Sequence, residues 1–227
     1  MGIRVPSRLF LLVIVLSGCS SPNRVGVQNS PDVVAAFVET VDAKYQSQQS
    51  TLGLRDVTLK FSLIPGSIFG APSTGDVLIE RTQVGNTFNL DLRRLGDSAA
   101  RLASPLNPRM AEAGMVIEPR NTRLARVGTF VFDTQTDQSS AAGMFIEPGT
   151  RDALALVYFD EPCRISGLMR MGEIEARHDI VIPGRGLHWI GIRESAGNHF
   201  YLWTSKVSER VIFGIRPFRK TPAGQDA

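Results

Sequence analysis

Short stretches in which apolar and polar residues alternate recur along the last third of this chain, and they constrain its fold more than any other feature. Alternation of this kind is typical of a strand with one buried face. The pattern predicts strands at 153–159, 163–168, 173–182, 187–194, 199–204 and 209–216. Residues 183–186 (Pro-Gly-Arg-Gly) are predicted to join two of them as a tight hairpin. So many short strands at this spacing indicate a β-sandwich or β-barrel.

Alternation also begins earlier, from Leu54 onward. It predicts strands around 57–63, 77–80 and 88–92, separated by Gly- and Pro-containing segments. Residues 96–113 break the pattern with Ala-rich segments, and Asn107-Pro108 is typical of a helix start. We therefore expect one or two short helices to cross over there.

The segment before these strands is predicted to be a helix over 31–46. Ser30 can cap it, Pro31 occupies the first helical position and Asp32 suits the positive end of the helix dipole. Apolar residues then recur at helical spacing at Val34, Phe37, Val41 and Tyr45. The β-branched residues in this segment oppose that prediction.

One heptapeptide occurs twice. Residues 113–119 (AGMVIEP) return as 142–148 (AGMFIEP), and each copy is followed by a polar turn and a long apolar segment. Two copies are too few for a solenoid. We interpret them as a duplicated strand–turn–strand unit. The alternative is a pair of equivalent ligand loops that carry Glu118 and Glu147.

Together these patterns predict a mainly β fold, a β-sandwich formed by one extended unit or two packed β-units. The expected parts are an N-terminal helix region at 31–52, a first β-unit at 53–135 with the helical crossover at 96–113, a second β-unit at 142–218 and a tail at 219–227. A polar linker at 136–141 would divide the two units. The run 164–204 resembles immunoglobulin-like or transthyretin-like sandwiches, which implies an architecture and no function.

The N-terminus has the layout of a secretory signal peptide. Arg4 and Arg8 precede the apolar run 9–16, which is much shorter than the roughly 20 residues that a membrane-spanning helix needs. The run ends in Leu16-Ser17-Gly18-Cys19, which resembles the lipobox of bacterial lipoproteins. A plain signal peptide or an uncleaved anchor is the alternative.

The lipobox resemblance implies cleavage after residue 18 and a diacylglyceryl group on the thiol of Cys19. Ser20, in place of Asp, implies sorting to the outer membrane, where we expect the periplasmic face; surface exposure is the alternative. Residues 19–30 comprise the lipidated Cys and a polar tether, and eleven residues reach at most about 40 Å. The body is therefore expected to stay close to the membrane.

Charge and cysteine content exclude two classes of protein. The whole chain carries +3, and loss of Arg4 and Arg8 with the leader brings the mature part close to +1. This charge is not that of a nucleic-acid binder, which needs clustered basic residues. With Cys19 committed to lipid, Cys163 has no intramolecular partner, so no disulfide framework holds the fold.

Candidates for chemistry are few. His178, His188 and His199 could suggest a metal site. The predicted hairpin register, however, places His178 opposite Gly191 and His188 on the other face of the sheet, so the two could not bind one ion. Cys163 could be a nucleophile activated by Arg164, but in a strand the two would face opposite ways, and a buried apolar cysteine is the commoner case.

Two surface patterns complete the set. An alternating polar face is expected at Glu173, Glu175, Arg177 and Asp179. Residues 199–203 (HFYLW) are the densest aromatic stretch, with Phe200 and Leu202 predicted to point one way. His199, Tyr201 and Trp203 would point the other way, as a binding platform for a sugar or a partner chain. A central strand covered on both faces is the alternative.

These observations favour a non-enzymatic, lipid-anchored envelope lipoprotein that acts through protein–protein binding or as an assembly accessory. We expect a membrane contact through Cys19, an envelope protein partner, and neither nucleic acid, metal nor cofactor. The alternatives are a carbohydrate or cell-wall binding module that uses Tyr201 and Trp203, and a hydrolase with an unrecognised site. Nucleophile-elbow, zinc-protease and phosphate-loop motifs do not occur in the sequence.

Overall fold

A computed structural model describes residues 32–42, 44, 46–47, 57–68, 77–83, 86–133, 139–195, 199–205 and 209–217. The predicted signal peptide, Cys19, the tether at 20–30 and the tail at 219–227 lie outside these residues. The two helices are α1 (Leu92–Leu102) and α2 (Pro108–Glu112). They confirm the predicted crossover, and Asn107 caps α2 with Pro108 in its first turn, as the sequence predicts.

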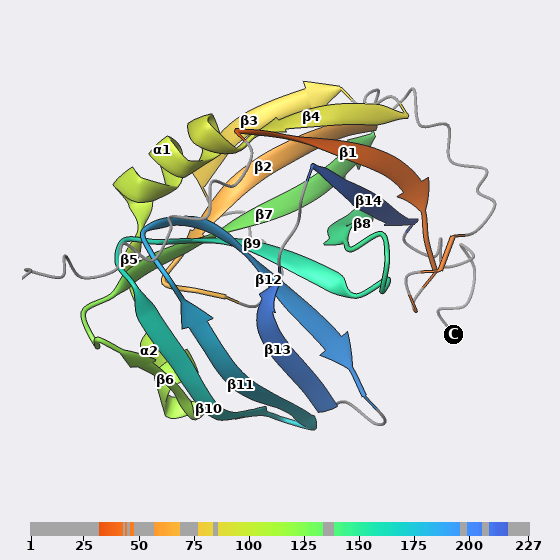
Figure 1. Ribbon diagram of the computed structural model, residues 1–227. Helices are drawn as coiled ribbons and strands as arrows, with labels where there is room; N and C mark the ends of the chain where they lie inside the picture. Colours follow the sequence, from red (N-terminus) through yellow and green to blue (C-terminus); the bar gives the residue numbers. More distant parts are fainter. Residues whose placement is uncertain are drawn as a thin grey trace, which may run out of the picture.

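Strands make up most of the described chain (Figure 1) and confirm the mainly β class. The first half contains β1 (Val33–Thr40), β2 (Val57–Pro65), β3 (Val77–Gln83), β4 (Thr87–Asp91), β5 (Ser104–Pro105), β6 (Met115–Glu118) and β7 (Arg123–Asp133). The second half contains β8 (Ser139–Ile146), β9 (Ala153–Phe159), β10 (Cys163–Met171), β11 (Ile174–Ile182), β12 (Gly186–Glu194), β13 (His199–Ser205) and β14 (Arg210–Pro217). The strands predicted in the last third are all present.

The described strands join in one large mixed sheet rather than in two separate ones. Its main path runs β4-β1-β14-β8-β7-β9-β12-β13-β11-β10-β6, and β2 pairs with the other edge of β7. Most neighbours are antiparallel, whereas β1–β14 and β11–β13 are parallel pairs. Strands from both sides of residues 136–141 are therefore hydrogen-bonded into the same sheet.

Strong curvature lets the sheet enclose its first hydrophobic core. Phe61 on β2 and Phe88 on β4 have ring centroids 6.1 Å apart, although the sheet path between them passes through β7, β8, β14 and β1. Phe213 on β14 meets Phe88 edge-on at 5.5 Å. Helix α1 closes one end of this core, with Leu95 and Ala99 buried beneath it (Figure 1).

A second core lies inside the other half of the sheet. Strands β9, β12, β13, β11, β10 and β6 surround it, and α2 contributes Met110. Its largest fully buried members include Phe159 and Met115. The two cores meet at β9. Along this strand Leu154, Leu156 and Tyr158 enter the first core, while Ala155, Val157 and Phe159 enter the second.

The predicted N-terminal helix is wrong, because residues 33–40 form the strand β1. Val34, Ala36 and Val38 are buried at every second position, in the first core. The apolar positions of this segment fit both a helical and a strand period. The sheet decides between them, since β4 and β14 hydrogen-bond to the two edges of β1 and its β-branched residues suit a strand.

The predicted tight hairpin at 183–186 is also wrong in its pairing. The chain does reverse there, but β13 lies between β11 and β12 in the sheet. The hydroxyl of Thr204 on β13 donates to the carbonyl of Val181 on β11 at 3.0 Å. His178 therefore lies opposite Gly167 and Leu202 instead of Gly191. β13, which follows both strands in the sequence, lies between β11 and β12 and prevents them from pairing with each other.

Both copies of the repeated heptapeptide end a strand that precedes a turn and a further strand, as predicted. Their pairing differs: β6 pairs with β10, whereas β8 pairs with β7, β9 and β14. Glu118 consequently lies at the edge of the second half of the sheet, and Glu147 lies at the β8–β9 turn, where it accepts a hydrogen bond from Thr150. The two glutamates are not equivalent ligands of one site.

We predict that truncation on either face of β9 destabilises the whole body. Leu156→Ala removes a side chain from the first core and Val157→Ala one from the second, and each should lower the free energy of unfolding by about 2 kcal/mol or more. The urea midpoint at constant m-value measures this loss. Val181→Ala, at a 62% exposed position, is the matched control and should shift it by less than about 0.5 kcal/mol. An unchanged free energy of unfolding in either β9 variant would contradict the conclusion that β9 contributes side chains to both cores.

Candidate functional site

The aromatic strand β13 is central in the sheet and yet open to solvent on one face. Leu202 is buried in the second core with Phe200 packed against it, as the alternation predicts. On the other face His199 is exposed, Tyr201 is 50% exposed and Trp203 is partly buried. The structure therefore places the three predicted platform residues together on one side of the strand.

The indole ring of Trp203 lies between the guanidinium of Arg193 and the backbone of Gly191. On the neighbouring strand β12, the guanidinium of Arg193 sits over the Trp203 ring, 5.1 Å from its centroid. Trp203 pairs with Gly191 across the same two strands, and a Cβ on Gly191 would overlap the indole ring. The absence of a side chain at Gly191 is what allows the ring to lie flat against the sheet.

Arg193 is held by a carboxylate in the turn that precedes β9. Its Nε and one terminal nitrogen donate to the two oxygens of Asp152 at 2.9 and 2.6 Å. The Asp152 side chain is only 8% exposed, whereas that of Arg193 is 56% exposed. The hydrogen bond from Arg193 lowers the pKa of the Asp152 carboxyl, and burial opposes this effect. A two-point contact of this kind fixes both the position and the plane of the guanidinium.

Tyr201 stands between two arginines. The strand register places it beside Arg193 on β12 and beside Arg177 on β11. We call the set Arg177, Arg193, Tyr201 and Trp203 the β13 face. Sequence reasoning missed Arg193 and Asp152, because they are far apart in the chain and only the pairing of β9 with β12 brings them together.

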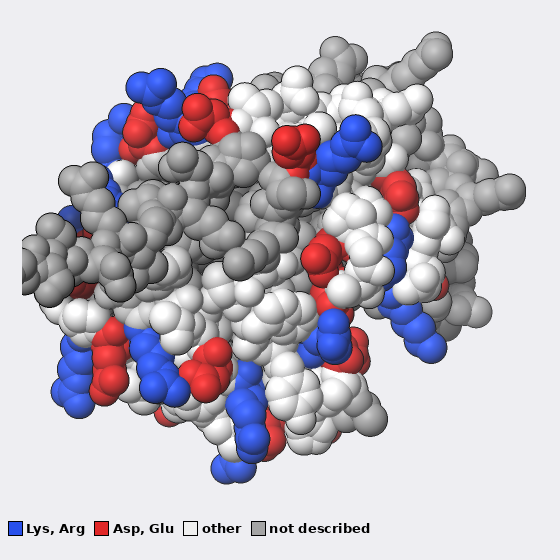
Figure 2. Space-filling model, viewed as in Figure 1, with Lys and Arg blue, Asp and Glu red and all other residues white. Residues whose placement is uncertain are grey.

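The polar face predicted at Glu173–Asp179 is confirmed as a solvated surface. Asp179 pairs with Arg164 at 2.9 Å and Glu175 with Arg170 at 3.2 Å, between β11 and β10. Figure 2 shows acidic and basic side chains interspersed over the lower part of the molecule, where Figure 1 places these strands. Asp179 and Glu175 on this face each have an oppositely charged neighbour.

The histidines do not form a metal centre. His178 is 3% exposed in the second core, and burial lowers its pKa to about 4. The Nε2 atom of His188 lies 2.8 Å from the carbonyl oxygen of Gly184, and His199 lies 3.6 Å from Glu175. Among the residues that the structure describes, no three His, Cys, Asp or Glu side chains converge on a common point.

Cys163 is a buried residue of the second core, as the sequence favours. Burial, followed by the charges of Glu161 and Asp160, raises the pKa of its thiol to about 12. The adjacent Arg164 points outward to Asp179. A thiol of this kind is protonated at neutral pH and is not an activated nucleophile.

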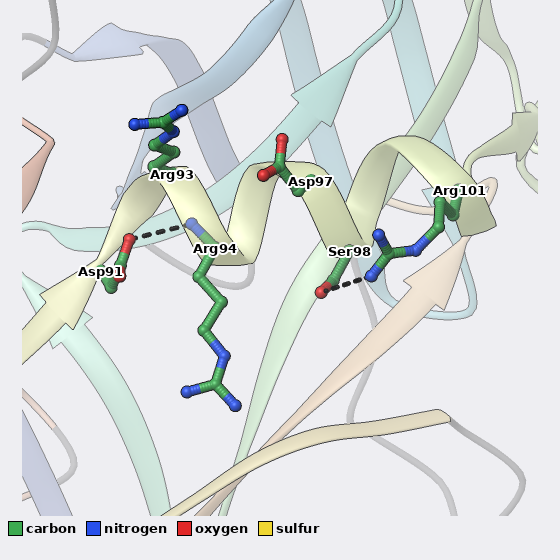
Figure 3. A pocket seen from close by; sticks show the side chains of 6 residues that line it. All are labelled: Asp91, Arg93, Arg94, Asp97, Ser98 and Arg101. Atoms are coloured by element: carbon green, nitrogen blue, oxygen red, sulfur yellow. Dashed lines mark hydrogen bonds between the residues drawn. The ribbon is translucent and has the colours of Figure 1, made fainter.

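A second polar surface lies on α1. Its outward residues line a hollow of about 440 Å³, drawn in Figure 3, namely Asp91, Arg93, Arg94, Asp97, Ser98 and Arg101. A groove of about 390 Å³ adjoins it, between α1 and the start of β12, where Arg185 donates to the hydroxyl of Tyr158 at 2.8 Å. Sequence reasoning did not single out these arginines, although Arg93, Arg94 and Arg101 lie close together in the sequence.

We predict an acid-sensitive stability that depends on His178. Its pKa is lower in the folded protein than in the unfolded chain, so the unfolded chain takes up the proton first as the pH falls. Stability should be complete above about pH 6.5 and fall by about 3 kcal/mol as the pH approaches 4. Burial also lowers the pKa of His188, which adds to the same slope.

His178→Leu should flatten this dependence, leaving the smaller contribution of His188. The measurement is the free energy of unfolding by urea at a series of pH values. The same slope in His178→Leu and in the unaltered protein would show that His178 is not buried in its neutral form.

We predict that Gly191→Ala displaces Trp203. The added methyl group would overlap the indole ring, and forcing it in should cost about 1–3 kcal/mol of stability. The fluorescence of Trp203 should change as its contact with Arg193 is lost. Gly149→Ala is the matched control, since nothing lies within 4 Å of a Cβ at that position. Unaltered stability and fluorescence in Gly191→Ala would contradict the arrangement described above.

Similarity to known proteins does not assign this surface a function. Comparisons with protein families, with curated proteins and with solved structures find no match to this chain. Within the described residues, neither helix has the length or the apolar run needed to cross a bilayer. Inference about function therefore starts from the residues of the chain and their geometry.

Proposed function

We propose that this protein is an envelope lipoprotein, anchored through Cys19 at the periplasmic face of the outer membrane, that binds another envelope protein without performing catalysis. The lipobox-like Leu16-Ser17-Gly18-Cys19 motif supports the anchor. Two or more acyl chains hold a protein stably on a bilayer. The binding role is supported by the β13 face.

The observation that carries the binding role is the exposure of Tyr201 between two arginines. Tyr, Trp and Arg are the residues most enriched among those that dominate binding energy at protein interfaces. Here Asp152 and the Trp203 ring already fix the guanidinium of Arg193. Because this side chain is ordered before any partner arrives, binding loses less conformational entropy.

The charges of the β13 face indicate the chemistry of its partner. Arg177 has no ion pair with any described carboxylate, and Arg193 is 56% exposed despite its contact with Asp152. Two guanidinium groups beside a phenol ring suit a partner segment that presents a carboxylate next to an aromatic or apolar side chain. The mixed charges on β10 and β11 would form the polar rim.

A carbohydrate-binding role remains the second candidate, supported by the exposed ring of Tyr201. The geometry supports it less well, because Arg193 already covers the Trp203 ring. Retention on peptidoglycan tests it: if a Tyr201→Ala, Trp203→Ala double variant is retained as well as the unaltered chain, a platform for sugars is excluded.

The third alternative, a hydrolase, has the least support. Cys163 lies opposite Ile182, and His178 is four residues further along β11, roughly 13 Å away at the rise of a strand. These two side chains therefore cannot form a nucleophile–base pair.

We predict that a photo-crosslinking amino acid at Tyr201 captures one discrete envelope protein when the full-length chain is expressed in its own cells. The same amino acid at Val116, an exposed apolar position on β6, should capture none. Arg193→Gln should reduce the yield at Tyr201 by about tenfold, since interface arginines of this kind contribute one or more kcal/mol. Arg109→Gln on α2 is the charge-matched control.

Cys19→Ala tests the anchor separately. This variant should lack the lipid by mass spectrometry and should leave the membrane fraction. Equal crosslinking at Tyr201 and Val116, or none at Tyr201, would contradict the binding role. A lipid-free Cys19 in the unaltered protein would contradict the anchor.

A further inference from the structure

The β8–β9 turn (147–152) supplies the carboxylate of Asp152. Its backbone closes on itself: the N–H of Glu147 donates to the carbonyl of Asp152, and the N–H of Arg151 donates to the carbonyl of Glu147, each at 2.9 Å. The hydroxyl of Thr150 donates to the Glu147 carboxylate at 2.6 Å and accepts from the N–H of Asp152 at 3.3 Å. The hydrogen bonds of the turn itself therefore fix the place where Asp152 begins.

Arg151 in this turn has a backbone conformation that residues with a Cβ rarely adopt. Its φ of 64° lies in the left-handed region, and it is the one non-glycine residue with a positive φ in the described part of the chain. The Cβ crowds the following carbonyl oxygen in that region, so the conformation persists only where neighbouring contacts enforce it. The contacts of Arg151 must therefore offset this conformational cost.

The side chain of Arg151 reaches across to β1. One of its terminal nitrogens donates to Oε2 of Glu39 at 3.0 Å, and the two side chains are only 22% and 31% exposed. Partial burial reduces screening by salt, so such a pair is stronger than one at the open surface. Glu39 lies on the face of β1 that points away from the first core, opposite Gly214 on β14. The ion pair thus ties the β8–β9 turn to the first described strand.

A continuous series of contacts connects β1 with the β13 face. Arg151 precedes Asp152 in the chain, and Asp152 holds the guanidinium of Arg193 at 2.9 and 2.6 Å. That guanidinium lies over the ring of Trp203 and beside Tyr201 in the strand register. Figure 1 shows β8 and β9 between β1 above and β13 below. The β8–β9 turn is therefore the connection between the two strands.

We propose that Glu39 and Arg151 position Asp152, and through it the guanidinium of the β13 face, so that β1 contributes to the affinity of this face for its partner. The inference rests on the binding role proposed above. Glu39 and Arg151 are positioning residues, since they lie outside the β13 face and act through Asp152. An arginine that is ordered before binding loses less conformational entropy, so loosening of Asp152 weakens binding.

The first measurement needs no partner. In the full-length chain the Nε–H resonance of Arg193 is assigned by its loss in Arg193→Lys, and its exchange with water is followed by nitrogen-15 NMR. Glu39→Gln and Arg151→Asn should each accelerate this exchange about threefold. Asn tolerates the left-handed backbone, so Arg151→Asn removes the ion pair and keeps the turn. Arg151→Lys, which keeps the positive charge, should restore most of the protection.

The second measurement is photo-crosslinking at Tyr201 in cells. Its yield should fall about threefold in Glu39→Gln. In an Asp152→Asn background, Glu39→Gln should have no further effect on the yield or on the exchange, because Glu39 acts only through Asp152. The charge-matched control is Glu118→Gln on β6, at the far edge of the sheet, which should change neither quantity.

Each outcome decides between the two proposals. Unaltered exchange at Arg193 in either positioning variant, or an equal change in the control variant, would overturn this inference. Additive effects of Glu39→Gln and Asp152→Asn would overturn it as well, since the two residues would then act independently. A full crosslinking yield in Glu39→Gln would overturn it and leave the binding role standing. If the unaltered chain captures no protein at Tyr201, the binding role and the effect on affinity are overturned together.

Discussion

The burial of β9 on both faces is the constraint on which the rest of the structure depends. In most strands of an antiparallel sheet one face meets the core and the other meets water. In β9 every side chain is buried, because alternate residues enter two different cores. The strand can be shared in this way only because the sheet curls in both directions from it, toward β7 and β8 on one side and toward β12 on the other.

The candidate binding surface follows from this arrangement. Pairing of β9 with β12 places Arg193 next to the turn that precedes β9. Asp152 lies in this turn, and its carboxylate is almost fully buried. β13 then adds to the other edge of β12 and brings Trp203 under the same guanidinium. A contact between the two halves of the sheet thus fixes the side chain that stands beside Tyr201. The guanidinium of Arg193 on the β13 face is held in place because Asp152 and Trp203, which contact it, are fixed by the strand pairing of the sheet.

Two surfaces of different character result. The β13 face combines aromatic rings with a guanidinium that is already ordered, a combination found at the centres of protein interfaces. The α1 surface is polar and carries both arginine and aspartate side chains, and the apolar side of the helix is buried in the first core.

The sequence by itself determined the fold class and most of the strands, because a period of two in apolar residues reports directly on a half-buried strand. It also determined that Phe200 and Leu202 face one way while His199, Tyr201 and Trp203 face the other, and it favoured a buried Cys163. The capped start of α2 followed from Asn107-Pro108 in the same way. These features depend only on residues close together in the chain. Whether the second face of β13 is open to solvent was decided by the structure.

Only the tertiary structure decided which strands are neighbours. Residues 33–40 carry an apolar pattern compatible with either a helix or a strand, and hydrogen bonding to β4 and β14 selected the strand. The insertion of β13 between β11 and β12 changed the residues opposite His178, and the pairing of β9 with β12 brought Asp152 to Arg193. The reason is physical: pairing between distant strands depends on the shape of the whole sheet, which no local pattern of residues encodes.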